Sequence, residues 1–190
     1  IIQLNDIYLK DRQDSVILVA DKVYADFELL SLLNNRLIIS SARLDDFQLN
    51  LSKDSTEAPL NIQFVIDAFK SKDNTPKTKL EVKINSINLA DGHFRFDVKN
   101  KEKLANKFDP NHIDISNLNA KLSLKSINPD SLNIQIKKLE LQEQSGLEIK
   151  NLIVRVVTQE NHLSVKGFKL SLPKSLLQFD KCEIDYIGFN

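Results

Sequence analysis

Few side chains in this chain of 190 residues combine the residue types and the spacing that catalysis or metal binding requires. Its three histidines, His93, His112 and His162, lie far apart near predicted turns, and none has a histidine or cysteine partner at metal-ligand spacing. We therefore predict that all three are solvated loop residues. The single cysteine, Cys182, occupies an inward-facing position of a predicted strand, so we expect a small buried side chain rather than a catalytic thiol.

Two charged clusters are the remaining candidates. Asp45 and Asp46 could supply a pair of carboxylates, but adjacent strand residues point to opposite faces, and Asp6 occupies the equivalent position of an earlier segment. This recurrence favours a structural role at a bulge. The lysine run from Lys99 to Lys107 is expected to be a solvated loop, with a phosphate or headgroup site as the alternative. The signatures of serine hydrolases, zinc peptidases and P-loop enzymes do not occur, so we expect neither an enzyme nor a cofactor or metal site.

The elements that would position these residues are strands, because almost the whole chain repeats one pattern of apolar residues. The pattern reads apolar, any, any, apolar, any, apolar, with a further apolar residue two places upstream, as in Ala42, Leu44, Phe47 and Leu49. Alternation at period two predicts strands. The extra residue at the same point of each copy predicts a β-bulge, which bends the strand and keeps the apolar side chains on one face.

The pattern predicts which side chains share a face. One continuous apolar surface is expected to include Ile84, Ile87, Leu118, Leu139, Leu152, Phe168, Leu170 and Ile184. The opposite face is expected to present Lys83, Lys137, Lys150, Arg155 and Lys169 to water. Such clean alternation is typical of an antiparallel sheet with one hydrated face.

We therefore predict a mostly β fold, in which a long, bulged antiparallel meander forms a curved sheet or taco-like groove with one or two short helices. Residues 28–34 are expected to form a helical turn or two at a sheet corner, and residues 61–70 a helix with Asn61 as its N-cap. Asp91-Gly92 predicts either a short turn or a second bulge in one long strand.

Composition restricts the class of protein. The 26 basic and 26 acidic residues give a net charge of zero, which argues against a nucleic-acid partner. The chain lacks methionine and opens inside a strand pattern, so we expect residues 1–190 to be a single β-rich segment of a longer repetitive protein. A boundary inside the segment would lie near residues 71–79 or 99–112, where the sequence is polar.

Four runs of the first half follow one another in a specific order: LNDIYLKD, ILVADKVYADFELLSLLNNRLIISSARLDDFQLNL, PLNIQFVIDAF and VKINSINLADGHFRF. A strand ends in a short L-L corner, a bulged strand follows, and then come a short helix, a polar linker and a strand that ends in D-G-x-F. This order resembles the AsmA-like superfamily, and within it the N-terminal region of the translocation and assembly module (TamB) type. The later runs SNLNAKLSLKSI, KKLELQEQSGLEIKNLIVRV and VKGFKLSLPKSLLQFD fit the same style, so the resemblance covers nearly the whole chain.

The resemblance implies a protein that is anchored in the inner membrane of a Gram-negative envelope, with a periplasmic body that encloses an apolar groove. It also implies a function in outer-membrane biogenesis, through phospholipid transport between the membranes or, in an older view, assembly of outer-membrane proteins. Phospholipid acyl chains and outer-membrane assembly proteins would be its partners. The anchor helix and the C-terminal domain of such proteins lie outside these residues.

Physical reasoning leaves a second interpretation open. A sheet with one apolar face must bury that face by pairing, by closing or by holding a ligand. A sheet that folds onto itself as a sandwich would have a dry core, and the protein would then be a structural scaffold that binds protein partners. An open apolar groove would instead mark a binding site.

Overall fold

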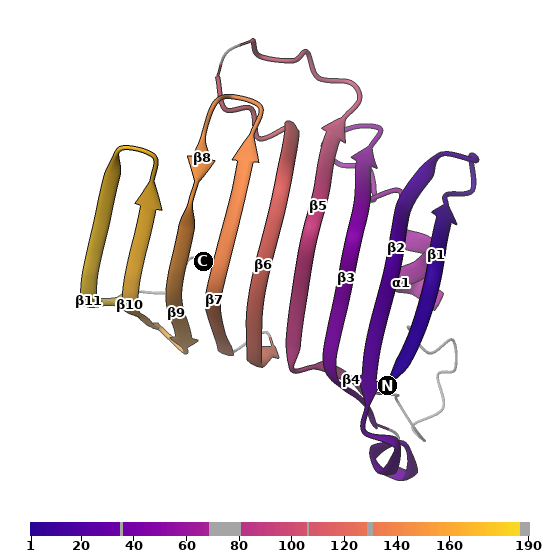
Figure 1. Cartoon of the computed structure of the whole chain (residues 1–190), viewed down its shortest axis with the longest axis horizontal. Coiled ribbons are helices and arrows are strands. Elements are labelled where there is room, and N and C mark those ends of the chain that lie inside the picture. Colours follow the sequence, from indigo (N-terminus) through magenta and orange to yellow (C-terminus); the bar gives the residue numbers. More distant parts are fainter. Residues whose placement is uncertain (35, 69–80, 106, 129–130, 187–190) are drawn as a thin grey trace.

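The computed structural model describes residues 1–34, 36–68, 81–105, 107–128 and 131–186, and within them one open sheet dominates (Figure 1). Its eleven described strands are β1 (Ile2–Lys10), β2 (Val16–Phe27), β3 (Arg36–Lys53), β4 (Glu81–Ile84), β5 (Ser86–Val98), β6 (His112–Asn128), β7 (Ser131–Glu143), β8 (Glu148–Ile149), β9 (Asn151–Gln159), β10 (His162–Leu172) and β11 (Ser175–Asp185). The strand order is β1-β2-β3-β5-β6-β7-β9-β10-β11, with β4 beside β3 and β8 beside β7. The mostly β, curved-sheet fold is therefore confirmed.

The sheet is mixed rather than purely antiparallel. All described neighbours are antiparallel except β3, which pairs in parallel with β4 and β5. Parallel neighbours need a crossover connection, often helical, and the segment between β3 and β4 contains α1 (Gln63–Ala68). This crossover is the departure from a simple meander. The polar stretch at 71–79 lies outside the described residues, and the division of the chain into domains stays a prediction.

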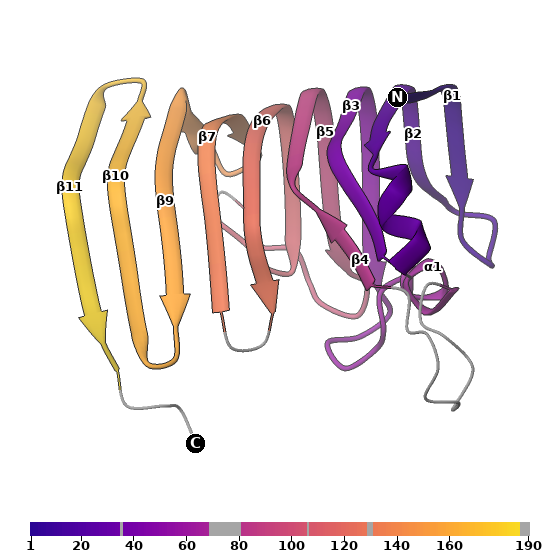
Figure 2. The same cartoon turned by 90° about the horizontal axis from the view of Figure 1, so that it is seen from below.

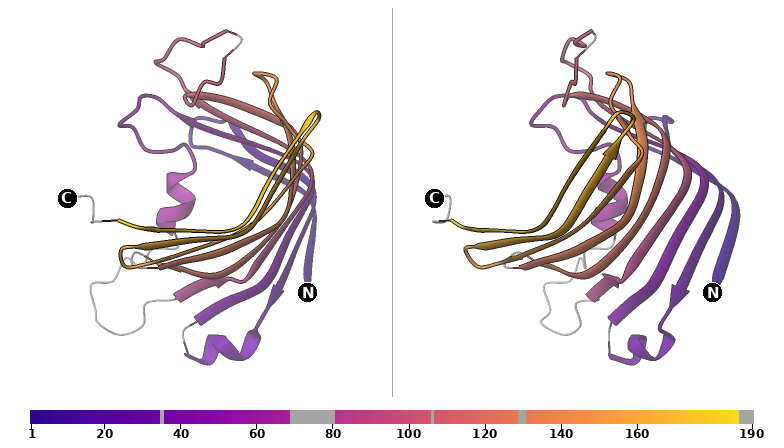
Figure 3. Two further views of the ribbon diagram at one scale, coloured as in Figure 1. Left: turned by 90° about the vertical axis from the view of Figure 1, so that its left-hand side faces the viewer. Right: turned by 60° about the vertical axis from the view of Figure 1, so that its left-hand side comes forward.

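A line of bends crosses the sheet at the predicted bulges. Residues with positive φ lie at the two-residue gap of the apolar pattern in four strands: Asp6 (51°), Asp46 (47°), Asn117 (52°) and Gly167 (58°). In β5 the positive φ belongs to Asp91 (51°), in the Asp91-Gly92 pair and not at the gap between Ile84 and Ile87. Asp, Asn and Gly tolerate this left-handed conformation better than other residues, which explains their recurrence there. Viewed end-on, the sheet folds along this line into a trough whose long axis runs across the strands (Figure 3).

The bend in β5 decides between the two predictions for Asp91-Gly92. Ser86–Val98 is one continuous strand, and the register to β6 shifts on both sides of Gly92, so the pair forms a bulge and not a turn. The bulge needs glycine because a Cβ at residue 92 would lie 2.2 Å from Cζ of Phe47. The Phe47 ring, 5% exposed, thus packs directly on the backbone of its neighbour.

Both helical segments are short. Leu29–Asn34 forms the 3₁₀ helix η1 at the corner between β2 and β3, as predicted. The predicted helix at 61–70 is observed only as Gln63–Ala68, and residues 69 and 70 lie outside the described residues.

Asn61 does not cap this helix, which corrects the prediction. Its side chain accepts a hydrogen bond from the amide of Ser52 (3.1 Å) and donates one to the carbonyl of Asn50 (3.1 Å). The ladder between β2 and β3 ends at Leu18 and Leu49, so the last residues of β3 lack a strand partner on that side. Asn61 satisfies those backbone groups instead of the helix amides.

The described residues of the trough form no closed core. Only seven of the described apolar side chains are buried: Ile17, Ala20, Phe47, Val98, Ala120, Leu141 and Val154. The chain exposes 13126 Å² of surface, whereas a compact protein of 21.7 kDa is expected to expose about 9,200 Å². Within the described residues there is no second sheet to cover the first, so the self-folded sandwich is not what the structure shows.

Candidate functional site

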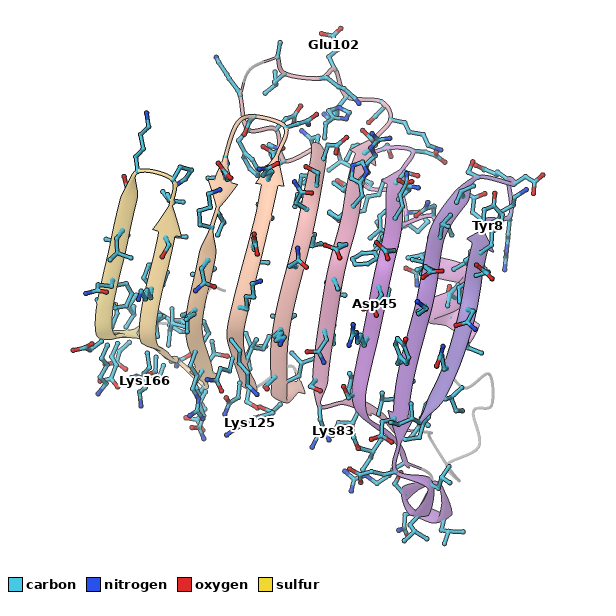
Figure 4. All side chains as sticks on the ribbon, in the orientation of Figure 1. Tyr8, Asp45, Lys83, Glu102, Lys125 and Lys166 are labelled. Atoms are coloured by element: carbon cyan, nitrogen blue, oxygen red, sulfur yellow. The ribbon has the colours of Figure 1, made fainter. Side chains whose placement is uncertain are left out.

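The concave face of the trough is the apolar one. Figure 4 looks onto the convex side, where Tyr8 and Asp45 stand toward the viewer, whereas α1 lies behind the sheet. Tyr8 alternates with Ile7 and Leu9 along β1, so these apolar neighbours point to the concave side. Figures 2 and 3 show α1 on that same side, near the β1 end of the trough.

Apolar side chains form rows that run along the trough from strand to strand. Register pairing places one row across six strands: Leu4, Val23, Leu44, Leu89, Ala120 and Leu139. A second row crosses seven strands: Ile2, Ala25, Ala42, Ile87, Leu122, Ile136 and Val154. A third continues the surface over β9, β10 and β11: Leu152, Leu170 and Leu177. The rows make the concave face continuous from one edge of the sheet to the other.

The residues predicted for this surface are spread along the trough and are only partly covered. Each of the following is half-buried: Ile84, Ile87, Leu118, Leu139, Leu152, Phe168 and Leu170. Ile184, on the edge strand, is 47% exposed. Phe168 stacks on Phe179 with 4.7 Å between the ring centroids, which forms an aromatic step near the β11 end. Partial exposure of this many apolar residues leaves room for an apolar ligand to bury them further.

One charged residue on the concave side was missed by the sequence analysis. Glu143 continues the alternation of Leu139 and Leu141, lies opposite Ile115 and is 6% exposed. Its carboxylate accepts hydrogen bonds from the amide (2.8 Å) and the hydroxyl of Ser145, while its Oε1 has no partner among the described residues. The period-two pattern contained this signal, because Glu143 stands where the next apolar residue is due.

The predicted water-facing residues lie on the convex face. Lys83, Lys137, Lys150 and Lys169 are exposed, and Lys150 pairs with Glu148 (2.5 Å). Arg155 is half-buried, and its Nε has no hydrogen-bond partner among the described residues. The expectation of a hydrated face thus holds for the lysines and only in part for Arg155.

The histidines depart from the prediction of solvated loop residues. His112 is 4% exposed, and its ring contacts Asp97 (2.9 Å) and the carbonyl of Lys101 (3.0 Å). It begins β6 next to the segment that carries Lys101, and burial in that position requires the two hydrogen bonds that it makes. The three histidines do not converge, and no group of potential metal ligands gathers in the described ranges.

The other two histidines also contact carboxylates. His93 lies 2.6 Å from Asp114, and His162 lies 2.7 Å from Asp185. Burial alone would raise the pKa of Asp114, but hydrogen bonds from His93 and Arg95 outweigh it and hold the pKa below its ordinary value. These hydrogen bonds tie β5 to β6 and β10 to β11.

The remaining chemical candidates are also held by local partners. Asp46 is the bulge residue, whereas Asp45 accepts a hydrogen bond from Arg43 (2.6 Å), so the two carboxylates do not act as a pair. Cys182 is half-buried rather than fully buried, which corrects the expectation for that residue. Its strand is the edge of the sheet, so only one side is covered.

The lysine run borders a hollow of about 590 Å³, and two of its lysines pair with nearby aspartates. Lys99 contacts Asp54 (2.8 Å) and Lys103 contacts Asp97 (3.5 Å). The hydrogen bond to Asp54 raises the pKa of Lys99. The pairing favours a solvated loop over an anion site.

Comparison of the chain with protein-family models, with curated proteins and with solved structures found no match. The resemblance to the AsmA-like superfamily therefore stays a prediction. None of the described helices has the length and apolar character needed to cross a bilayer.

Proposed function

We propose that this chain is a segment of an envelope lipid conduit, in which the concave face of the trough carries phospholipid acyl chains. The observation that supports the proposal is the continuous apolar surface: two rows of side chains start at β1 and a third continues to β11, so that together they cross the sheet, and most of their members are only half-buried. Exposed apolar patches larger than a few hundred Å² mark binding sites in soluble proteins.

The proposal explains why the chain offers no conventional polar site. Each methylene of an acyl chain that leaves water contributes about 0.8 kcal/mol, so a tail can bind by burial alone. A trough that is open along its length also lets a tail slide from strand to strand along the rows, because each row presents the same kind of apolar surface.

The cellular setting of the proposal depends on the family resemblance. In that setting the trough is a periplasmic part of an inner-membrane-anchored protein for outer-membrane biogenesis, with a non-enzymatic function in phospholipid transport. Outer-membrane assembly proteins would be further partners.

Photo-crosslinking at residue 139 tests the proposal. A photoreactive side chain at 139 points into the trough, and the same group at Lys137 on the convex face is the matched control. We expect phospholipid adducts at 139 and none at 137, together with phospholipid that co-purifies with the 190-residue chain in native mass spectrometry. Leu139→Arg or Leu170→Arg should abolish the co-purifying lipid while far-UV circular dichroism stays unchanged.

The opposite result of these two experiments would refute the proposal. If no lipid co-purifies and residue 139 crosslinks only to residues of its own chain, the concave face is a dry surface. The protein would then be the scaffold that binds protein partners, which is the alternative function.

A further inference from the structure

Buried polar atoms without a partner gather on the convex face of the trough. In the described part of the chain five buried side-chain atoms make no hydrogen bond, and four of them lie on the neighbouring strands β7, β9 and β10: Asn133 Oδ1, Asn151 Oδ1, Arg155 Nε and Ser164 Oγ. Each of these residues alternates with apolar residues of the concave face, so all four side chains point to the convex side. Buried polar groups are normally paired, so water or a ligand is expected here.

Arg155 lies at the centre of this group and stands beside other cations. In the sheet it lies opposite Lys166 of β10, and Lys166 lies opposite Lys181 of β11. Directly opposite side chains on one face have Cβ atoms about 4.5–5.5 Å apart, and like charges there are destabilising. The convex face therefore carries three positive charges in one row, and an anion between them would relieve their repulsion.

The carboxylate that is nearest in the register is already held by one of these cations. Glu183 contacts Lys181 (2.6 Å), and this hydrogen bond lowers the pKa of Glu183. The side chains of Arg155 and Lys166 make no hydrogen bond or ion pair with any described residue. Three cations against one carboxylate leave two positive charges uncompensated.

Ser164 adds a neutral donor to the two unpaired cations. It is 6% exposed, and its hydroxyl has no partner among the described residues. It lies two residues before Lys166 on the same face of β10, and opposite Val157, which is two residues from Arg155. Diagonal neighbours of this kind are within reach of long side chains. The guanidinium and the ammonium group can therefore reach a ligand that accepts a hydrogen bond from Ser164.

This donor set suits a phosphate group. A guanidinium fork binds two phosphate oxygens at once, an ammonium group adds a point charge, and a hydroxyl donates to a further oxygen. We propose that the convex face of β9 and β10 binds a phosphate group through Arg155, Lys166 and Ser164. A phospholipid headgroup and a soluble phosphate both present this chemistry. The site lies on the face opposite the apolar trough, so it does not depend on what the concave face carries.

The lysine run from Lys99 to Lys107 differs from this site in its pairing. Lys99 and Lys103 each contact an aspartate, so their charges are compensated within the chain. Arg155 and Lys166 lack such carboxylates among the described residues, and a buried, unpaired hydroxyl accompanies them. This combination favours the convex face of β9 and β10 as the anion site.

Titration of the 190-residue chain with inorganic phosphate at constant ionic strength tests the proposal. We expect one saturable site, and Arg155→Gln and Lys166→Gln should each weaken it about tenfold, because each removes a charge-assisted hydrogen bond. Lys121→Gln is the matched control, because it removes the same charge from an exposed position on the convex face of β6. It should change the affinity by about twofold or less, since screening weakens the effect of more distant charges.

A second probe distinguishes the two sources of phosphate. Vesicles of equal parts phosphatidylcholine and phosphatidylglycerol should co-sediment with the chain if the site takes a lipid headgroup, and Lys166→Gln should then reduce co-sedimentation. Saturable binding of inorganic phosphate without co-sedimentation would identify a soluble phosphate as the ligand.

Ser164→Ala tests the site without a change of charge. Its hydroxyl is buried and unpaired in the free chain, so its removal should leave the urea midpoint unchanged or raise it, whereas phosphate binding should weaken about threefold or more. If Arg155→Gln does not fold, Lys166→Gln at an exposed position carries the same test. No saturable binding of either probe, equal weakening by Lys121→Gln and Lys166→Gln, or unchanged binding in Ser164→Ala would each overturn the proposal.

Discussion

The bulge in β5 allows a quantitative test of how the trough is bent. Replacing Gly92 by alanine would place a Cβ 2.2 Å from Cζ and 2.3 Å from Cε1 of Phe47, far inside van der Waals contact. Gly92 does not have a positive φ, so alanine is compatible with the backbone and the cost comes from the ring alone.

The expected magnitude combines two opposing effects. Overpacking of a buried site costs about 1–3 kcal/mol. Alanine also restricts the unfolded chain, which returns about 0.4–1 kcal/mol. We therefore expect Gly92→Ala to lower the free energy of unfolding by about 1–2 kcal/mol. With a urea m-value of about 2 kcal/mol/M, the midpoint would fall by roughly 0.5–1 M.

A double-mutant cycle isolates the contact with the ring. Phe47→Ala alone should cost about 3–5 kcal/mol, because it removes a buried aromatic side chain. In that background the Cβ at residue 92 meets no ring, so Gly92→Ala should become neutral or slightly stabilising, with a coupling energy of about 1–3 kcal/mol. If Phe47→Ala is too unstable to measure, Phe47→Leu shortens the side chain and should reduce the cost of Gly92→Ala in the same direction.

Urea denaturation followed by far-UV circular dichroism suits this sheet, since the chain has no tryptophan. Gly167→Ala is the control. It also lies at a bend, but its cost comes from a φ of 58° with open space around it, so that cost should be equal with and without Phe47. Additive effects of Gly92→Ala and Phe47→Ala would refute the packing argument.

Three further predictions follow from other parts of the sheet. Leu152→Asp should destabilise the chain by about 1–3 kcal/mol in urea denaturation, because it places a charge among half-buried apolar side chains, whereas Lys150→Asp, at an exposed position, should change stability much less; equal effects would reverse the assigned faces. Asn61→Ala should cost about 1–3 kcal/mol and speed amide exchange at the end of β3, since two part-buried hydrogen bonds are lost, and unchanged exchange there would contradict the bridging function. Hydrogen bonds from the backbone amides of Leu104 and Asn111 hold the pKa of Asp109 below its ordinary 3.8. The ionised Asp109 carboxylate therefore stabilises the fold fully above pH 3.8, and this stabilisation is lost as the pH falls through the lower pKa of the folded state. Asp109→Asn should flatten this part of the acid unfolding curve, and an unaltered curve would exclude the effect.

Several features were predictable because they depend on neighbours in sequence. The period-two pattern identified the strands and the apolar face, and the recurring two-residue gap located the bends at Asp6, Asp46 and Gly167. The leucine corner after β2 was also predictable, since its composition and length allow only a helical turn. Each of these features follows from backbone and side-chain preferences over a few residues.

Other features required the folded chain. The buried state of His112 depends on Asp97 and on the segment that carries Lys101, and the hydrogen bonds of Asn61 depend on where β2 stops pairing with β3. The parallel contact between β3 and β5 could not be inferred from alternation, because period two is the same in both directions.

The sequence by itself determined that this protein is a bent sheet with one apolar face, because alternation and bulge residues are local properties of the chain. Only the tertiary structure decided that this face stays open as a trough, because covering it depends on whether a second layer returns over the sheet. In the described residues the strands extend sideways in one layer, with a short helix near one end, and the apolar rows remain half-exposed. Pairing between strands satisfies the hydrogen-bonding groups of the backbone, but it cannot by itself bury the apolar face of the sheet. The strands therefore follow from the sequence pattern, whereas the exposure of their apolar face depends on the tertiary structure.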